Sequence, residues 1–280
     1  MAHEFESVSI EQVRAYWDAR PCNVRHSPKP VGEREYFDEV EARKYFVEPH
    51  IPRFAEFARW KGKRVLEIGC GIGTDTINFA RAGAEVTAVD LSEVSLAIAR
   101  RRAEVFGLRG IRFIQANVEE LRRSVPVEPY DLVYAFGVLH HTPRPRRALD
   151  EIRDFLGEDG VLKIMVYHRH SWRALAIVLR YGKGAFWAAD RVIARHSEAQ
   201  VGSPVTYTYT RRGIRALLRA AGYRVESIQV EHIFPWKVSD YVQYRYSKVW
   251  YFRVLPDRVF RWMERRFGWH LLVTARSDGR

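Results

Sequence analysis

The sequence reads RVLEIGCGIGT over residues 64–74 and VTAVDLS over residues 86–92. Each apolar run predicts a buried strand, the glycines predict a tight turn into a helix, and the second strand ends in Asp90. Glycine lets the backbone approach a ligand where a Cβ atom would collide, and a carboxylate at a strand end accepts hydrogen bonds from ribose hydroxyls. The two stretches therefore predict a βαβ unit that binds a nucleoside.

The spacing of the glycines narrows the choice of ligand. A dinucleotide fingerprint has the form G-x-G-x-x-G, whereas this chain carries Gly69, Gly71 and Gly73, with Thr74 at the position of the third glycine of that pattern. Glu67 adds a carboxylate near the turn, which favours a cationic ligand and disfavours a diphosphate. S-adenosylmethionine, with its ammonium and sulfonium groups, meets these requirements.

Four stretches, in order along the chain, resemble the motifs of class I S-adenosylmethionine-dependent methyltransferases. They read VLEIGCGIG over residues 65–73, FIQANVEEL over 113–121, YDLVYAFGVLHH over 130–141 and LGEDGVL over 156–162. The branch that they resemble most acts on small molecules and includes quinone-biosynthesis methyltransferases. That branch usually has Asp where this chain has Asn117, whose amide oxygen can still accept a hydrogen bond from the adenine amino group.

The resemblance implies an α/β fold, in which a doubly wound, Rossmann-like sheet of seven strands has an antiparallel last strand. Residues 1–60 are expected to form an N-terminal helical lid, and residues 61–280 the methyltransferase core. Cap insertions are expected at about 169–209, after the fifth strand, and at about 233–269, between the last two strands. The last three strands are predicted at residues 161–167, 224–231 and 270–275.

Two helix boundaries carry local signals. Ser9 and Gln12 have the spacing of a capping box, which predicts a helix that begins at Ile10. Thr210 is predicted to cap a later core helix that stops at Gly222.

The resemblance also implies the donor-binding residues. It places the glycines against the methionine and ribose parts of the donor, and Asp90 at the ribose hydroxyls. Leu91 and Ser92 would flank the adenine, although Ser92 is equally suited to cap the next helix. Thr74 is either a donor contact or an ordinary helix-start residue. The implied set is Glu67, Gly69, Gly71, Gly73, Thr74, Asp90, Leu91, Ser92, Asn117, Val118 and Phe136.

The catalytic candidates are two adjacent histidines. Methyl transfer needs an acceptor atom in line with the departing sulfur, and proximity and alignment can supply roughly 7–11 kcal/mol of the acceleration. A hydroxyl acceptor also needs a base. His140 and His141 follow the fourth strand, where this fold places its acceptor, and an unperturbed pKa of about 6.5 suits that task. Either ring could instead hold the loop or contact the donor.

Substrate contacts are expected in the N-terminal lid, because helices that precede the core commonly close over the donor in such enzymes. An exposed capping loop is the alternative for the same segment. Arg25 and His26 would suit an anionic acceptor. The candidates are Tyr16, Asn23, Arg25, His26 and Tyr36.

The insertion at 233–269 interleaves aromatic residues with arginine and lysine, as in YVQYRYSKVWYFR over residues 241–253. Three interpretations compete. The segment is an aromatic cap packed on the core, a substrate lid with an amphiphilic pocket, or an interfacial element in peripheral contact with anionic lipid. The first two are compatible, because a packed cap can line a pocket.

Composition and the missing motifs limit the other classes of function and partner. The formal net charge of +12 allows an acidic partner, but the basic residues are dispersed, and no Asn/Asp-Pro-Pro-Tyr loop follows the fourth strand, so nucleic acid is disfavoured. No sequence cluster has the spacing of a zinc site, which predicts no metal. Two cysteines, the absence of an N-terminal signal pattern and the absence of a membrane-spanning apolar run predict a cytoplasmic protein.

The leading hypothesis is a methyltransferase that acts on oxygen or nitrogen of a small, amphiphilic or aromatic metabolite. An RNA methyltransferase and a non-catalytic S-adenosylmethionine-binding subunit are the alternatives. The identity of the acceptor and the oligomeric state are left open by the sequence.

Overall fold

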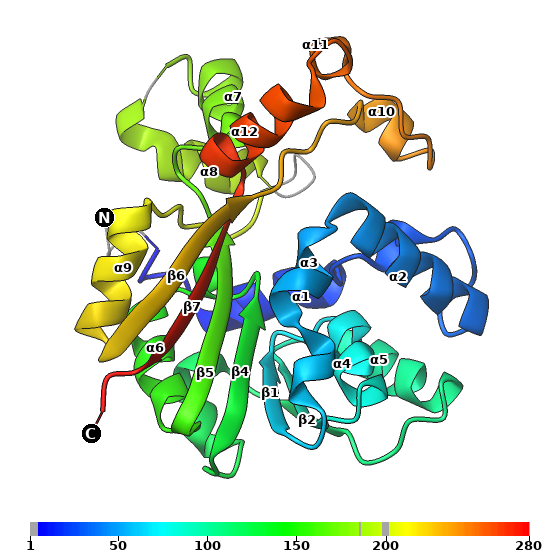
Figure 1. The fold of residues 1–280 in the computed structure, drawn as a ribbon, viewed down its shortest axis with the longest axis vertical. Helices are drawn as coiled ribbons and strands as arrows, with labels where there is room; N and C mark the ends of the chain where they lie inside the picture. Colours follow the sequence, from blue (N-terminus) through cyan, green and yellow to red (C-terminus); the bar gives the residue numbers. More distant parts are fainter. Residues whose placement is uncertain (1–4, 185, 198–201, 280) are drawn as a thin grey trace.

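The computed structural model describes residues 5–184, 186–197 and 202–279, and a seven-stranded sheet forms its centre (Figure 1). The strand order is β3-β2-β1-β4-β5-β7-β6, and β7 runs antiparallel to both of its neighbours. This order confirms the predicted doubly wound sheet with an antiparallel last strand. The strands are β1 (Arg64–Ile68), β2 (Glu85–Asp90), β3 (Arg112–Gln115), β4 (Tyr130–Phe136), β5 (Leu156–Tyr167), β6 (Tyr223–Glu231) and β7 (His270–Ser277).

Both faces of the sheet are buried, which explains why its central strands are almost continuously apolar. Leu66 and Val133 belong to the hydrophobic cluster on one face. Their sequence neighbours Val65 and Leu132 belong to the cluster on the other face. Successive side chains of a strand point to opposite faces, so two neighbouring apolar residues contribute to two different layers of the core.

Helices cover the sheet between successive strands, and their starts follow the predicted caps. The hydroxyl of Thr210 accepts a hydrogen bond from the N–H of Gly213 at 2.9 Å, and Gly222 follows the same helix with a φ of +79°. The helices of the core are α4 (Thr74–Arg81), α5 (Glu93–Val105), α6 (Pro145–Arg153) and α9 (Arg211–Ala220), with short 3₁₀ turns η3 (Val118–Arg123) and η4 (Leu139–His141).

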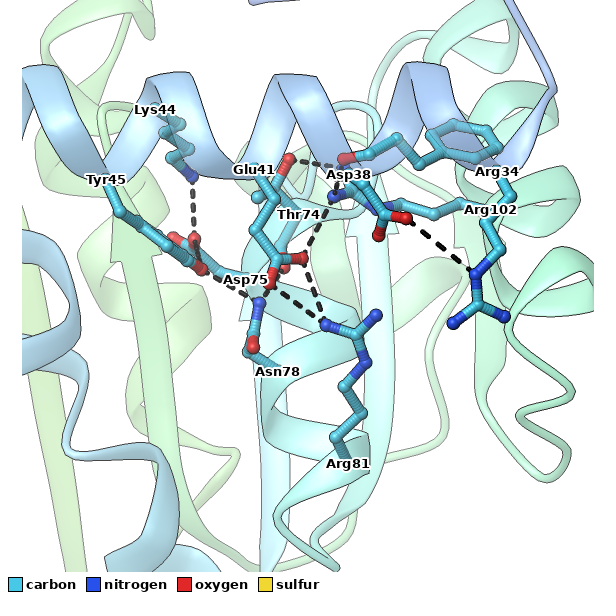
Figure 2. Close-up of polar contacts among 11 residues, drawn as sticks. Arg34, Asp38, Glu41, Lys44, Tyr45, Thr74, Asp75, Asn78, Arg81 and Arg102 are labelled. Atoms are coloured by element: carbon cyan, nitrogen blue, oxygen red, sulfur yellow. Dashed lines mark hydrogen bonds and ion pairs between the residues drawn. The ribbon is translucent and has the colours of Figure 1, made fainter.

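The N-terminal segment is helical and packs beside α4 and α5 (Figure 1). Its first helix has the predicted capping box, formed by Ser9 and Gln12. Its second helix is held to the core by the fully buried Arg102, which donates to the Thr74 hydroxyl at 2.6 Å and to the carbonyl of Phe37 at 3.0 Å (Figure 2). The elements are α1 (Ile10–Ala19), η1 (Val24–His26), α2 (Arg34–Val47), α3 (His50–Ala55) and η2 (Phe57–Trp60).

The fifth strand begins earlier than predicted. We expected it to start at Val161, but β5 starts at Leu156, which pairs with Tyr130 before the register shifts. Gly160 permits the irregularity, because a Cβ atom there would lie 2.8 Å from the carbonyl oxygen of Tyr130. The motif LGEDGVL over residues 156–162 therefore lies inside β5, where it forms a bulge.

Both insertions lie beyond the carboxyl ends of the parallel strands (Figure 1). In the second insertion Phe252 is buried, whereas Trp250 and Trp262 are 69% and 61% exposed. The packed-cap interpretation thus describes Phe252 but not the two tryptophans, and contact with lipid stays a prediction. No helix among the described residues has both the length and the apolar character to cross a membrane. The elements are α7 (Trp172–Tyr181), η5 (Phe186–Ala188), α8 (Ala189–His196), α10 (Val238–Tyr241), α11 (Trp250–Arg253) and α12 (Asp257–Phe267).

Candidate functional site

A cavity of about 720 Å³ lies where the parallel strands end, between the N-terminal helices and the two insertions. Ligands of open α/β sheets bind in this position, outside the carboxyl ends of the strands. Many of the predicted site residues line it: Asn23, His26, Gly69, Gly71, Thr74, Asp90, Leu91, Asn117, Val118, Phe136 and His141. The others, which lie off its wall, are Tyr16, Arg25, Tyr36, Glu67, Gly73, Ser92 and His140.

The three glycines of the turn all have positive φ but differ in what surrounds them. A Cβ atom on Gly69 would lie 2.2 Å from Cγ2 of Val138, and one on Gly73 would lie 3.0 Å from Cβ of Ala99. A Cβ atom on Gly71, in contrast, would meet nothing within 4 Å. Gly69 and Gly73 therefore allow the turn to pack against the protein, and Gly71 opens its backbone to the cavity.

Asp90 ends β2 at the cavity wall, as predicted. Its carboxylate accepts one hydrogen bond from the N–H of Gly71 and one from the N–H of Ser92, each at 2.8 Å. A carboxylate has about four acceptor sites, so further hydroxyl donors can bind to it from the cavity. Burial raises the pKa of Asp90 to about 6, so the group is ionised at pH 7.

Glu67 does not present a charge to the cavity. Its carboxyl group is buried behind the turn, where the hydroxyl of Thr76 donates to it at 2.5 Å. Burial and the neighbouring charge of Asp75 raise the pKa of Glu67 to about 8. The raised pKa favours the neutral form of Glu67, and the side chain does not line the cavity, so it does not attract a cationic ligand in the way expected from the sequence.

The buried charge at this end of the cavity belongs to a residue that sequence reasoning missed. Asp75 in α4 accepts from Nζ of Lys44 at 2.7 Å and from the hydroxyl of Tyr45 at 2.9 Å (Figure 2). It also accepts from the hydroxyl of Tyr134 at 3.2 Å. Lys44 itself lines the cavity. The position of Asp75 after the glycine turn hinted at a functional role, but its partner on α2 carries no sequence signal.

The residues expected near the adenine of the donor make hydrogen bonds to the backbone at the starts of helical segments. Ser92 is fully buried and accepts from the N–H of Ser95 at 3.1 Å, which is the helix-cap arrangement. Asn117 lines the cavity, and its Oδ1 accepts from the N–H of Glu119 at 3.0 Å. Thr74 also lines the cavity while its hydroxyl accepts from Arg102. These polar groups are therefore fixed in position by the protein.

The two histidines of η4 have different environments. Nδ1 of His141 lies 2.7 Å from the carbonyl oxygen of Val205. Because a carbonyl only accepts, Nδ1 carries the hydrogen, and Nε2 carries the lone pair of the neutral ring. His140 is fully buried, lies with its ring centroid 3.8 Å from that of Tyr167, and has its pKa lowered by burial. Only His141 reaches the cavity.

The predicted substrate contacts of the lid separate into two groups. Asn23 and His26 line the cavity, but burial, together with the charge of Arg43, lowers the pKa of His26 to about 3, so its ring is neutral at pH 7. The hydroxyl of Tyr16 donates to the carbonyl of Gly202. Tyr36 is fully buried and donates to the carbonyl of Val24 at 2.8 Å.

The far wall of the cavity is aromatic and basic. The individual residues of this wall were not identified from the sequence, because they come from the ends of β5, β6 and β7, from α7 and from the second insertion. Their spacing along the chain has no pattern. They include Tyr167, Trp172, Arg173, Arg180, His232, Tyr241, Trp269 and His270.

A family model described as a methyltransferase domain matches residues 40–228, more than half of the chain. A ubiquinone biosynthesis O-methyltransferase of Glaesserella parasuis serovar 5 (strain SH0165) is 33% identical over 121 residues, which are 42% of this chain and 51% of that protein. The ubiquinone biosynthesis O-methyltransferase of Haemophilus ducreyi (strain 35000HP / ATCC 700724) is 36% identical over 111 residues, or 39% and 47% of the two chains. The chain spans about half the length of the curated relatives it matches.

Solved structures show the same fold. Magnesium protoporphyrin IX methyltransferase from Synechocystis PCC 6803 with bound SAH superposes with a TM-score of 0.59 at 17% identity, covering 95% of this chain and 98% of that one. The cyclase SpnF superposes with a TM-score of 0.58 at 18% identity, covering 97% of each chain. Since one neighbour is a methyltransferase and the other a cyclase, this likeness establishes architecture but not the reaction.

The family model supplies what the fold alone leaves open. Its match runs from α2 into β6 and so contains the glycine turn, Asp90 and the η4 histidines. The strand order of the sheet agrees with it independently. The chain therefore belongs to the class I methyltransferases that use S-adenosylmethionine as methyl donor.

Proposed function

We propose that this protein transfers a methyl group from S-adenosylmethionine to an oxygen or nitrogen atom of a small amphiphilic or aromatic molecule. The observation that carries the proposal is the single cavity shared by the glycine turn and the aromatic far wall. Asp90 lies at one end of it, and Trp172 and Trp269 belong to the other. A cavity of about 720 Å³ has the size of a small-molecule site rather than of a groove for nucleic acid.

The reaction that we propose needs little covalent chemistry from the protein. The glycine turn and Asp90 would hold the donor, which would supply its sulfonium methyl group to an acceptor at the far wall. The acceptor atom attacks that methyl carbon, the carbon–sulfur bond breaks with its electron pair going to sulfur, and S-adenosylhomocysteine is released. Aromatic side chains hold the acceptor and exclude water, and alignment supplies most of the acceleration.

The test of this function uses S-adenosylmethionine with a labelled methyl group, the purified protein and a cell extract divided into small-molecule and RNA fractions. We expect label in a product of low molecular mass that is soluble in organic solvent. Label in the RNA fraction would support the RNA alternative instead. Binding of the donor without any transfer of label would support a non-catalytic subunit.

His141 is our candidate for the base. Its Nδ1–H is directed at the carbonyl of Val205, so the basic lone pair of the neutral ring is on Nε2, the atom that we propose accepts the proton of an acceptor hydroxyl. Replacing His141 with Gln should lower kcat about 10²–10⁴-fold, the usual contribution of a general base, and leave the affinity for the donor unchanged. The loss should shrink as pH rises toward the pKa of the acceptor hydroxyl, which can be followed in a pH–rate profile.

His196 offers a matched control, because it is another histidine of the cavity wall and stacks on Tyr181 at a centroid distance of 4.1 Å. His196→Gln should change kcat only slightly. Equal losses in the two variants, or a loss in His141→Gln that is independent of pH, would assign His141 a structural role.

A further inference from the structure

Three residues with metal-binding side chains meet at the cavity, although one of them, His270, lies 220 residues beyond His50 in the sequence. Glu48 ends α2, His50 begins α3, and His270 begins β7. β7 is antiparallel to β5, so its first residue lies at the edge where the parallel strands end. The N-terminal segment brings Glu48 and His50 to that same edge.

The distances among these three side chains match a metal site. Nε2 of His50 lies 2.9 Å from Nδ1 of His270, and that Nδ1 lies 3.7 Å from Oε1 of Glu48. One donor atom from each residue lies within 4.8 Å of the others. Metal–ligand bonds of about 2.0–2.2 Å place the ligands of a tetrahedral ion roughly 3.3 Å apart, so a small closing or opening movement is enough.

The surroundings of the cluster are unusual for a plain hydrogen bond between two histidines. His232 lies against it, with its ring centroid 4.7 Å from that of His270 and 5.5 Å from that of His50. His232 has a φ of +73°, a left-handed conformation that residues with a side chain rarely adopt. Strained backbone of this kind concentrates at functional sites, and here it places a further imidazole beside the cluster.

The position of the cluster leaves one side open to a ligand. Glu48 and His270 line the cavity, whereas His50 is buried behind them. Tyr167 separates the cluster from the candidate base, with ring centroids 6.1 Å from His270 and 5.6 Å from His141. An ion held by the cluster would therefore face the acceptor rather than be enclosed as a structural metal.

We propose that Glu48, His50 and His270 bind one divalent transition-metal ion whose open position faces the acceptor half of the cavity. Two imidazoles and one carboxylate suit Zn²⁺ or Fe²⁺, whereas Mg²⁺ and Ca²⁺ prefer ligand sets made of oxygen alone. The binding of the ion is independent of the proposed function.

The role of the ion rests on the proposed function. An acceptor hydroxyl that coordinates the ion would have its pKa lowered, would lose its proton to solvent, and would attack the donor methyl group as an alkoxide or phenolate. The metal undergoes no change of oxidation state in this step. It would act as a Lewis acid on the acceptor oxygen.

The test is calorimetric titration of the chelator-treated, untagged protein with Zn²⁺, together with the visible absorption of the Co²⁺ form. We expect one ion per chain and the intense d–d bands of a four-coordinate site. Glu48→Gln and His270→Gln should each weaken Zn²⁺ binding more than about 100-fold, beyond the loss that follows removal of an outer-shell partner. His170→Gln is the control, because His170 is an exposed histidine outside the cluster.

Binding of S-adenosylhomocysteine by each variant, measured in the same buffer, shows whether the donor end is still folded. If Zn²⁺ does not bind the unaltered protein, or binds all four proteins equally, the proposal is overturned and the contact between His50 and His270 is only a hydrogen bond. If Zn²⁺ binds as expected but the protein transfers no methyl group, the site stands and the proposed function fails.

Discussion

Asp90→Ala should abolish measurable binding of S-adenosylmethionine. In the unaltered protein the carboxylate is already fixed by the N–H groups of Gly71 and Ser92, so it is positioned before the donor arrives. Two charge-assisted hydrogen bonds to the ribose hydroxyls contribute about 1.5–3 kcal/mol each, and their loss corresponds to roughly 10²–10⁴ in Kd. Isothermal titration calorimetry with S-adenosylmethionine and S-adenosylhomocysteine measures this directly.

Two further variants separate recognition from damage to the turn. Asp90→Asn keeps the shape of the side chain and one acceptor oxygen, so it should weaken donor binding less than Asp90→Ala. Glu93→Gln removes an exposed carboxylate in the first turn of α5 and should leave the affinity unchanged. Donor binding by Asp90→Ala within a few-fold of the unaltered protein would remove Asp90 from the site.

The same carboxylate gives donor binding a predicted pH dependence. Because the pKa of Asp90 is raised to about 6 by burial, the group becomes protonated below pH 6 and loses its charge toward the ribose hydroxyls. Donor affinity should then fall, by at most about tenfold per pH unit. The effect on folding has the opposite sign, because a carboxyl with a raised pKa favours the folded state at low pH and loses that contribution as pH rises through 6. Asp18 contributes to the raised pKa, and Asp90→Asn should flatten the binding profile.

The donor end was predictable because its signals are local. Gly71 and Asp90 lie in one βαβ unit, where continuously apolar strands, glycine conformation and strand length all act within a short stretch of chain. The doubly wound sheet with its antiparallel last strand was implied by the family that the motifs resemble. Ser92 shows the limit of local reading, because its contact with Ser95 is a cap that the same sequence pattern allows.

The acceptor end was not predictable in the same way. Glu48, His50 and His270 come together only after the N-terminal segment packs on the sheet and the last strand returns antiparallel. His270 lies 220 residues beyond His50, so no metal-like spacing joins all three residues in the sequence. Tyr36 shows the opposite case. Its place in the predicted lid suggests a contact with the acceptor, whereas its ring packs in the core between α2 and the glycine turn.

The contact between Lys44 and Asp75 carries the second large effect that we expect. Asp75 is 2% exposed and accepts hydrogen bonds from Lys44, Tyr45 and Tyr134, so it joins α2 to α4 and to β4. Asp75→Ala would leave the Lys44 ammonium and two hydroxyl groups buried without their acceptor. Breaking a buried ion pair by removing one partner costs about 3–5 kcal/mol of the free energy of unfolding. Urea denaturation, with the slope compared between variants, measures that cost.

An exposed ion pair on α2, the helix that carries Lys44, provides a matched comparison. Asp38 pairs with Arg34 at 3.7 Å, and both side chains are more than half exposed, so Asp38→Asn should change stability by no more than about 1 kcal/mol (Figure 2). The single variant Asp75→Asn should also lower the free energy of unfolding, because it removes one charge of the pair. The double variant Lys44→Met with Asp75→Asn should recover part of that loss, because it removes both charges together. If the losses of the single variants simply add, Lys44 and Asp75 are not coupled. Coupling would instead show that the buried pair holds α2 of the lid against α4, the helix that follows the glycine turn.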